Sequence, residues 1–352
     1  MWLVKNTEFR ESQKIFIMAK KRVLSCIQPT GEIHIGNYFG AIKNWVDIQD
    51  KYECIYGVVD LHAITMPYDP GELRENTYRM AVDLMVCGLD PNKTLIFIQS
   101  LVPEHTELAW IFNCIASYGE LTRMTQFKDK TEQVETGGKG SFVSAGLFTY
   151  PILQAADILI YKADYVPVGR DQVQHLELSR NIAVRFNNQY ETYFPEPHPL
   201  LTETPKLASL ADPTKKMSKS LGDKHFIGLF EEEESIRKKV KTAVTDTGEK
   251  QGGEMSPGVE NLFNLIKACG RMVEFNQLLK QYNSGTLRYK DLKEVTADSI
   301  VKLTSGLRKK RDEFLKNRDQ NEKIIKTLSD KARDFASQTV KDVKRLTGLP
   351  VL

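Results

Sequence analysis

The sequence predicts an α/β fold in which a doubly wound parallel-sheet domain is followed by an all-helical domain. Short apolar runs at residues 22–27, 54–59 and 94–99 have strand length and show no polar alternation. Runs of this kind are typical of strands in a parallel sheet that is buried on both faces. A segment with helical periodicity follows each run, whereas beyond about residue 230 only charged helical segments remain.

The remaining elements follow from periodicity and from the positions of glycine and proline. In the sheet domain we expect a strand at residues 165–168 and helices at 38–51, 72–87, 106–116, 120–127, 150–161 and 171–186. Residues 128–144 are polar and glycine-rich, which favours a flexible insertion. Residues 187–206 hold four prolines and are interpreted as a connection. In the second domain we expect helices at residues 232–244, 259–269, 272–282, 289–316 and 331–346.

Composition excludes some functional classes and leaves others open. The 352 residues are 41% hydrophobic and 27% charged, and the net charge of +3 permits a polyanionic partner without requiring one. The five cysteines form no Cys-x-x-Cys pair, which indicates reduced thiols in the cytoplasm and no protein-bound zinc. No apolar run approaches membrane-spanning length, and residues 1–20 are interpreted as a dispensable extension.

A glycine-containing stretch, residues 28–37, joins the first strand to the next helix. Such a turn presents free backbone N–H groups and the positive end of a helix dipole, which bind phosphate readily. Gly31 and Gly36 permit close approach of the backbone, and His34 and Asn37 can donate to phosphate oxygens. The alternative is a tight turn with a capping asparagine and a partly buried histidine.

A second stretch, Lys-Lys-Met-Ser-Lys-Ser at residues 215–220, lies in a predicted loop. Alone it is best explained as a solvated basic loop. Combined with residues 28–37, it suggests a nucleotide held at both ends, with Lys216 and Lys219 reaching a departing pyrophosphate. If the attacking group is a carboxylate, the reaction needs charge neutralisation and no general base.

Both stretches resemble motifs of class I aminoacyl-tRNA synthetases: residues 28–37 resemble the first motif, and residues 216–220 match the second. The segments between and after them resemble bacterial and organellar tryptophanyl-tRNA synthetases in order and spacing, namely residues 60–65, 119–128, 150–159, 166–172 and 243–246. The resemblance implies a Rossmann-like catalytic domain, ATP as substrate with its Mg²⁺, and L-tryptophan and tRNA(Trp) as partners. It also implies a homodimer.

The resemblance further implies a role for individual residues. The catalytic residues would be Lys216, Lys219 and Lys130. The ATP site would comprise Gln28, Pro29, Thr30, His34, Gly36, Asn37, Gly169, Arg170, Asp171, Leu207, Lys216, Met217, Ser218, Lys219 and Ser220. The tryptophan site would comprise Asp157, Tyr150, Gln154, Gln172 and His62.

Asp157 has a physical argument of its own. It lies in a strongly apolar predicted helix, where an unpaired carboxylate would be costly, so a ligand N–H is a good reason for its presence. Pairing with a nearby lysine, or capping of a neighbouring turn, is the alternative. A buried hydrogen-bonding site of this kind discriminates well between substrates, because a substrate without the partner group leaves it unsatisfied.

The chain departs from the family pattern at Leu24, Cys26 and Gln154, which are expected in the wall of the substrate pocket. The spacing of Tyr150, Gln154 and Asp157 is also similar to that of tyrosyl-tRNA synthetases, so tyrosine is the second candidate substrate. A non-catalytic paralogue that binds amino acid or RNA is the third hypothesis. This third hypothesis is disfavoured, because the lysines of the second motif and the glycine-containing turn are intact.

The resemblance also suggests domain boundaries. Residues 21–228 would form the catalytic domain, residues 229–330 a helical anticodon-binding domain, and residues 331–352 a helix that packs back on the catalytic domain. Basic clusters at residues 237–241 and 308–311 are explained either as solvated helix faces or as contacts to the tRNA backbone.

Overall fold

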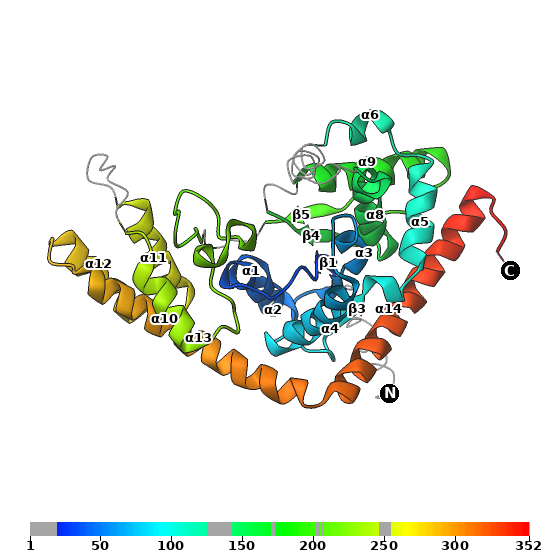
Figure 1. Cartoon of the computed structure of the whole chain (residues 1–352). Coiled ribbons are helices and arrows are strands. Elements are labelled where there is room, and N and C mark those ends of the chain that lie inside the picture. The colour runs from blue at the N-terminus through cyan, green and yellow to red at the C-terminus, as the bar shows by residue number, and fades with distance from the viewer. Residues whose placement is uncertain are drawn as a thin grey trace, which may run out of the picture.

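The computed structural model describes residues 20–124, 143–169, 173–201, 205, 207–245 and 255–351. In this part of the chain, parallel strands form a sheet in the order β3-β2-β1-β4-β5 (Figure 1). The strands are β1 (Arg22–Ile27), β2 (Glu53–Val58), β3 (Thr94–Ile98), β4 (Tyr165–Pro167) and β5 (His198–Leu200). The doubly wound parallel sheet predicted from the sequence is confirmed.

The edge strand β5 was not predicted, because its prolines were interpreted as marks of a connection. Among the described strands it pairs only with β4, and Pro199 lies opposite Val166. A strand with one neighbour tolerates proline, because the missing N–H can face away from the ladder. The interpretation of this segment as a connection is therefore wrong at residues 198–200, which form a strand.

The strand order reverses at β1, which has β2 on one side and β4 on the other. In open parallel sheets, ligands bind outside the carboxyl ends of the strands at such a switch point. We therefore expect the ligand site beyond the carboxyl ends of β1 and β4, which are at Ile27 and Pro167.

The helices differ from the predictions mainly at their ends. In the sheet domain they are α1 (Ile35–Asn37), a π-helical stretch (Tyr38–Ile42), α2 (Lys43–Ile48), α3 (Asp60–Ala63), α4 (Pro70–Val86), α5 (Glu104–Asn113), α6 (Tyr118–Leu121), α8 (Ala145–Ile160) and α9 (Val173–Gln189). Short 3₁₀ turns occur at Gln99–Leu101, Lys219–Leu221 and Asp223–His225. The second domain contains α10 (Glu233–Thr242), α11 (Pro257–Ala268), α12 (Met272–Asn283), α13 (Tyr289–Leu315) and α14 (Arg318–Thr347).

Local chemistry fixes several of these helix ends. Asp69 caps α4 by accepting a hydrogen bond of 2.8 Å from the Glu72 N–H, and Pro70 occupies the first turn. Ser144 caps α8 by accepting from the Leu147 N–H at 3.1 Å. That cap explains why α8 begins at Ala145, five residues before the predicted start at 150.

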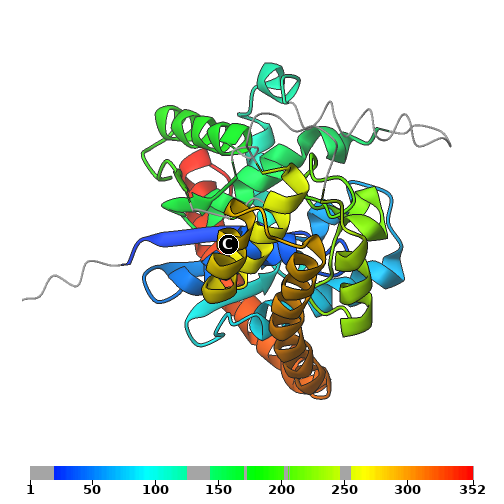
Figure 2. The ribbon, with the colours of Figure 1, turned by 90° about the vertical axis from the view of Figure 1, so that its left-hand side faces the viewer.

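Alternate residues of the strands face two separate cores. Val23, Tyr56 and Ile96 pack under α2 and α4, in a core that continues into the helices of the second domain. Their sequence neighbours, which are Leu24, Ile55 and Phe97, pack against α5, α8 and α9. The period of two residues along each strand thus separates the layers. Figure 2 views the molecule from the helical end, with α11 to α13, yellow to orange, in front of the sheet domain.

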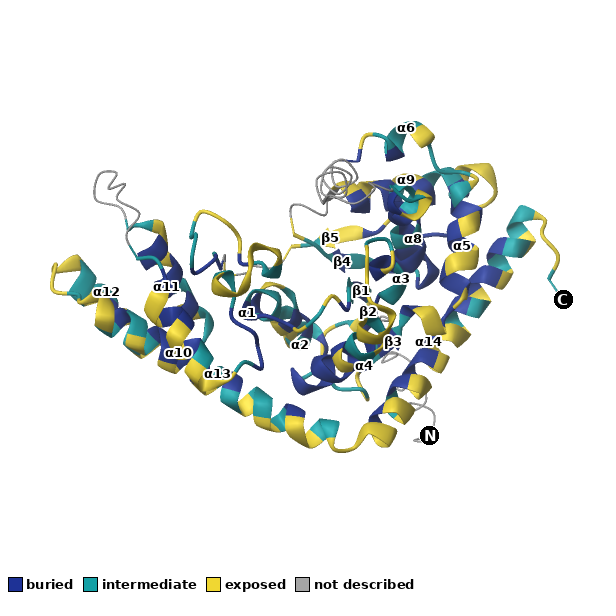
Figure 3. Ribbon diagram, viewed as in Figure 1, coloured by how far each residue is buried: buried dark blue, intermediate teal, exposed yellow. Residues whose placement is uncertain are grey.

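The helix α14 joins the two cores. Its first half contributes Ile325 and Leu328 to one core, and its second half contributes Ala332 and Val340 to the other. Buried and exposed residues alternate along it (Figure 3). The helix also binds the sheet domain through polar contacts, since the Thr339 hydroxyl donates to the Ile160 carbonyl at 2.8 Å.

The predicted start of this last helix at residue 331 is wrong, because α14 begins at Arg318. Its first turns are polar, so an apolar period was recognisable only further along. The helix passes through the predicted boundary at residue 331 without a break. None of the helices in the described ranges is long and apolar enough to cross a membrane.

Candidate active site

The nucleotide turn, residues 28–37, follows β1 and leads into α1. Gly31 has a φ of +80°, a conformation that favours glycine. The Asn37 N–H donates to His34 Nδ1, and the His34 N–H donates to Asn37 Oδ1, each at 3.3 Å. These two side chains therefore close a reciprocal cap at the start of the helix.

His34 is almost completely buried, with 6% of its surface exposed. Burial, together with the positive charges of Lys219 and Lys216, lowers the pKa of His34 to about 4. The imidazole is therefore neutral near pH 7. A Cβ atom at Gly36 would lie 2.8 Å from the His34 ring, so this position requires glycine.

The lysine loop, residues 215–220, lies directly against the nucleotide turn. Lys219 Nζ donates to the carbonyl oxygens of Thr30 at 2.5 Å and Glu32 at 2.8 Å. Burial between these segments lowers the pKa of Lys219. The two stretches singled out in the sequence, which are separated by almost 190 residues, are thus in contact.

Backbone hydrogen bonds hold the lysine loop from both sides. The Met217 N–H donates to the Leu207 carbonyl at 3.2 Å, and the buried Met217 side chain anchors the loop in the first core. After the loop, the Leu229 N–H donates to Ile33 at 2.8 Å, and Ile35 donates to Ile227 at 3.0 Å. The chain that leaves the loop is therefore paired with the nucleotide turn.

A cavity of about 230 Å³ opens at the switch point between β1 and β4. It is lined by residues from both strands, from α3 and from α8: Leu24, Ser25, Cys26, Gln28, Val59, His62, Tyr150, Gln154, Asp157, Ile158, Val166, Pro167 and Val168. The structure therefore brings together His62, Tyr150, Gln154 and Asp157 of the predicted tryptophan site. Gln28 of the predicted ATP site lies in the same wall.

The deepest polar group of the cavity is the Asp157 carboxylate, which is 2% exposed. It accepts hydrogen bonds from His105 Nδ1 at 2.6 Å, Gln99 Nε2 at 2.7 Å and His62 Nε2 at 2.8 Å. Burial alone would raise the pKa of Asp157, but the hydrogen bonds from His105 and His62 lower it to about 2. The carboxylate is therefore an anion at neutral pH.

Gln99 and His105 were not predicted from the sequence. Both are fully buried, and the other ring nitrogen of His105 lies 2.9 Å from the Tyr161 hydroxyl. Since an ionised carboxylate only accepts, His105 donates from Nδ1 and its Nε2 can accept from Tyr161. The available signal was their position just after the strand Thr94–Ile98, where polar residues reach a crevice. Within the described residues, the side chains that contact the Asp157 carboxylate are histidine and glutamine, and none of them is a lysine.

Some of the remaining predicted residues lie in or beside the cavity, and others lie outside the described residues. Tyr150 is buried, with its hydroxyl 2.9 Å from His175 Nε2 and its ring edge-on to His62. Gly169 is exposed directly after Val168 of the cavity wall. Four predicted residues lie outside the described part of the chain: Lys130, Arg170, Asp171 and Gln172.

In the described ranges, no group of three or more histidine, cysteine, aspartate or glutamate side chains could hold a metal ion. All five cysteines are free thiols.

A parallel sheet with a nucleotide turn at its switch point, faced by a lysine loop, defines a class I aminoacyl-tRNA synthetase. The family model for class I tRNA synthetases of types W and Y matches residues 18–305. The tryptophan–tRNA ligase of Clostridium tetani is 45% identical over 94% of this chain and 96% of its own length. That of Helicobacter pylori is 43% identical over 94% of this chain and 100% of its own.

Solved structures agree with these relatives. The tryptophanyl-tRNA synthetase of Mycoplasma pneumoniae superposes with a TM-score of 0.83 at 34% identity, over 94% of this chain and 98% of that one. The Campylobacter jejuni enzyme, solved with ADP and tryptophan, gives 0.80 at 33% identity, over 93% of this chain and 100% of that one. The chain belongs to the tryptophanyl-tRNA synthetase family.

Proposed function

We propose that this protein activates L-tryptophan with ATP, releases pyrophosphate, and transfers the tryptophanyl group to the terminal ribose of tRNA(Trp). One observation carries the proposal: the cavity that contains the ionised Asp157 lies at the same switch point as the nucleotide turn and its lysine loop. An amino acid in the cavity and a nucleotide on the turn would therefore be neighbours.

For tryptophan, we assign Asp157 as the acceptor of the indole N–H. Of the three side chains that donate to it, only His62 lines the cavity, whereas Gln99 and His105 do not. His62 is therefore the donor that gives way when the indole N–H arrives. Tyr150 and Gln172 would face the amino group, and Gln154 the ring.

For ATP, the backbone of the nucleotide turn would face the phosphates, together with Gln28, Pro29, Thr30, His34, Gly36 and Asn37. Leu207 would lie beside adenine, and Gly169, Arg170 and Asp171 beside the ribose. In the structure, Lys219 is bonded to carbonyls of the turn, so it must exchange these partners for phosphate oxygens. Mg²⁺ would arrive with ATP as part of the substrate.

The activation step needs little covalent help from the protein. A carboxylate oxygen of tryptophan bonds to the α-phosphorus, and the bond from this phosphorus to the oxygen bridging to the β-phosphate breaks. The carboxylate is already ionised, so no general base is required. Lys216 and Lys219, with Met217, Ser218 and Ser220 of the same loop, and Lys130 from outside the described residues, would stabilise the departing pyrophosphate.

For tRNA, we assign a basic groove of about 530 Å³ between α10 and α13. Four cationic side chains and one carboxylate line it, with Tyr289 and Ala297: Arg237, Lys241, Lys290, Lys293 and Glu294. Cationic side chains of this kind bind phosphates, and an exposed tyrosine can stack on an unpaired base. The groove includes part of the basic cluster at residues 237–241.

The basic cluster at residues 308–311 is a poorer candidate for RNA contact. Arg308 donates to the Glu231 carbonyl, and Lys310 donates to the Val86 carbonyl at 2.9 Å. Arg311 is 8% exposed and paired with carboxylates. Lys310 and Arg311 contact α4 of the first domain, so a freely solvated face does not describe these two side chains.

We also propose a homodimer and a cytoplasmic location. Two large aromatic side chains are exposed, Trp110 of α5 at 71% and Tyr118 of α6 at 74%. Aromatic residues are enriched in protein–protein interfaces, so these are positions at which we expect a second copy to bind. Free cysteines throughout the chain support a reducing compartment.

The experiment that tests the function is ATP–pyrophosphate exchange with each amino acid in turn. We expect exchange with tryptophan and at most trace exchange with tyrosine, because tyrosine has no indole N–H to satisfy Asp157. Exchange with tyrosine alone would show that the protein activates tyrosine and not tryptophan. Exchange with neither amino acid would favour a non-catalytic binding protein.

A further inference from the structure

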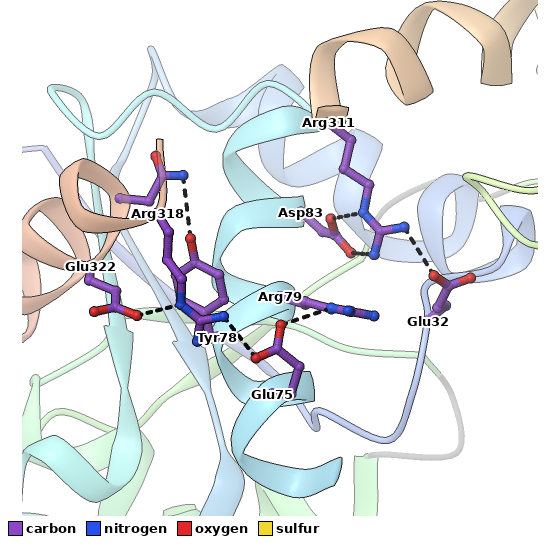
Figure 4. A network of polar contacts seen from close by, with 9 residues as sticks. Glu32, Glu75, Tyr78, Arg79, Asp83, Arg311, Arg318 and Glu322 are labelled. Carbon is purple, nitrogen blue, oxygen red and sulfur yellow. Dashed lines mark hydrogen bonds and ion pairs between the residues drawn. The ribbon is translucent and has the colours of Figure 1, made fainter. Parts of the chain in front are cut away.

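A guanidinium group from the second domain reaches the nucleotide turn (Figure 4). Arg311 of α13 contacts Asp83 of α4, with Nε 2.8 Å from Oδ1 and the second terminal nitrogen 3.1 Å from Oδ2. Its remaining terminal nitrogen lies 3.0 Å from Oε1 of Glu32, which belongs to the turn. The buried Arg311 thus forms ion pairs with carboxylates from two different segments.

Glu32 makes two different contacts at the nucleotide turn. Its carbonyl oxygen accepts from Lys219, while its side chain is 53% exposed and pairs with Arg311. An unpaired negative charge here would repel ATP phosphates and would retain Lys219 at the turn. Arg311 supplies the positive charge that compensates the Glu32 carboxylate.

Attachment of α13 does not require the contact with Glu32. Lys310 donates to the carbonyls of Met85 and Val86 at the end of α4, and Arg308 donates to the Glu231 carbonyl. The Arg311 guanidinium also lies 4.2 Å over the Phe230 ring. The ion pair between Arg311 and Asp83 adds to the contacts that hold α13 on α4. The contact between Arg311 and Glu32 is additional to these, so we expect it to act on the nucleotide turn and not on the attachment of the helix.

We propose that Arg311 is a positioning residue of the ATP site, which neutralises Glu32 and holds the nucleotide turn in the form that accepts phosphates. The proposal rests on the proposed function, because it assumes that ATP binds at this turn. It assigns to a helix of the second domain a direct effect on the affinity for the nucleotide.

The test compares ATP dependence in the exchange reaction between variants of the full chain. Asp83→Asn combined with Arg311→Gln removes both members of the buried pair and leaves no buried charge unpaired. We expect the KM for ATP to rise about threefold to fivefold at low ionic strength, with the KM for tryptophan unchanged. Adding Glu32→Gln should restore the parent KM for ATP, since the repelling charge is then gone.

Arg318→Gln is the matched control. Arg318 of α14 pairs with Glu75 of the same helix α4 at 3.1 Å and also appears in Figure 4, but it makes no contact with the turn. We expect its KM for ATP to equal that of the parent. Urea unfolding of each variant separates loss of stability from loss of affinity.

Two results would overturn the proposal: an unchanged KM for ATP in the double variant, or a raised KM that Glu32→Gln does not restore. If the double variant does not fold, Arg311→Lys replaces it, because charge compensation predicts a KM for ATP close to the parent value. A large rise with lysine would then contradict the proposal. Absence of exchange in the parent protein would reject the proposed function instead.

Discussion

Asp157 shows how a single residue acquires its properties from its neighbours. The side chain is buried in an apolar helix, yet its carboxylate accepts from Gln99, His105 and His62. These donors stabilise the anion, so the carboxylate can discriminate for an N–H group without being neutralised by burial.

Asp157→Asn is expected to weaken tryptophan binding by about tenfold to a hundredfold, because a hydrogen bond to a charged acceptor is lost. Binding of the benzothiophene analogue of tryptophan, which has no ring N–H, should change far less. Isothermal titration with both ligands measures the two effects. Equal losses of affinity for the two ligands would show that Asp157 does not accept the indole N–H.

The depressed pKa of Asp157 also predicts a pH dependence of stability. The folded carboxyl has a pKa of about 2 and the unfolded one 3.8, so the stabilisation is complete above pH 4 and is lost as the pH falls towards 2. We expect the parent protein to lose about 1 kcal/mol more than Asp157→Asn between pH 5 and pH 3. Urea unfolding at both pH values measures this difference, and identical losses would contradict the assignment.

At the scale of elements, the important contact joins the nucleotide turn to the lysine loop. Residues 28–37 and 215–220 were predicted to act on one nucleotide from opposite sides. In the structure they touch directly through Lys219, and residues 227–229 pair with the turn. The loop therefore rests on the turn, and in the proposed function ATP phosphates would have to replace the Thr30 and Glu32 carbonyls as partners of Lys219.

Lys219→Ala is expected to slow amino-acid activation by about a hundredfold, because a positive charge aimed at the departing pyrophosphate is lost. Tryptophan binding should stay near the parent value, since Lys219 does not line the cavity. Lys215→Ala is the control, because Lys215 lies on the same loop but pairs with Asp212 at 3.2 Å. Single-turnover exchange measures the rate; an unchanged rate for Lys219→Ala would refute its role.

Elements of strong periodicity were predictable, and those held by distant contacts were not. The strand Thr94–Ile98 was recognisable because its residues are continuously apolar. The strand His198–Leu200 was not, because its short run is stabilised by pairing with β4 rather than by its own composition. The early start of α14 likewise depends on partners, such as Glu75 for Arg318.

At the scale of the whole molecule, the second domain presents the basic groove of α10 and α13 to solvent, while Lys310 and Arg311 contact α4 of the first domain. We expect Lys241→Ala with Lys290→Ala to weaken tRNA binding and to reduce the slope of log K against log salt concentration by about 1.5. Lys309→Ala, an exposed lysine outside the groove, is the control.

Filter binding of tRNA over a range of salt concentrations measures that slope. Amino-acid activation should be unaffected in the same variants, because the groove lies outside the cavity of the first domain. A slope equal to that of the parent would exclude the groove as a contact with the tRNA backbone.

The sequence by itself determined the doubly wound sheet and the two motifs, which depend on local periodicity and on residue types whose chemistry is recognisable without a structure. Asp157 also had an argument from its apolar helix, whereas His62, Tyr150 and Gln154 were assigned to the pocket through the resemblance to a family. Only the tertiary structure decided that Gln99 and His105 hold Asp157, that Arg311 is buried and faces Glu32, and that Lys310 donates to α4. Each of these depends on which side chains meet across distant segments, and that is fixed by packing rather than by local pattern.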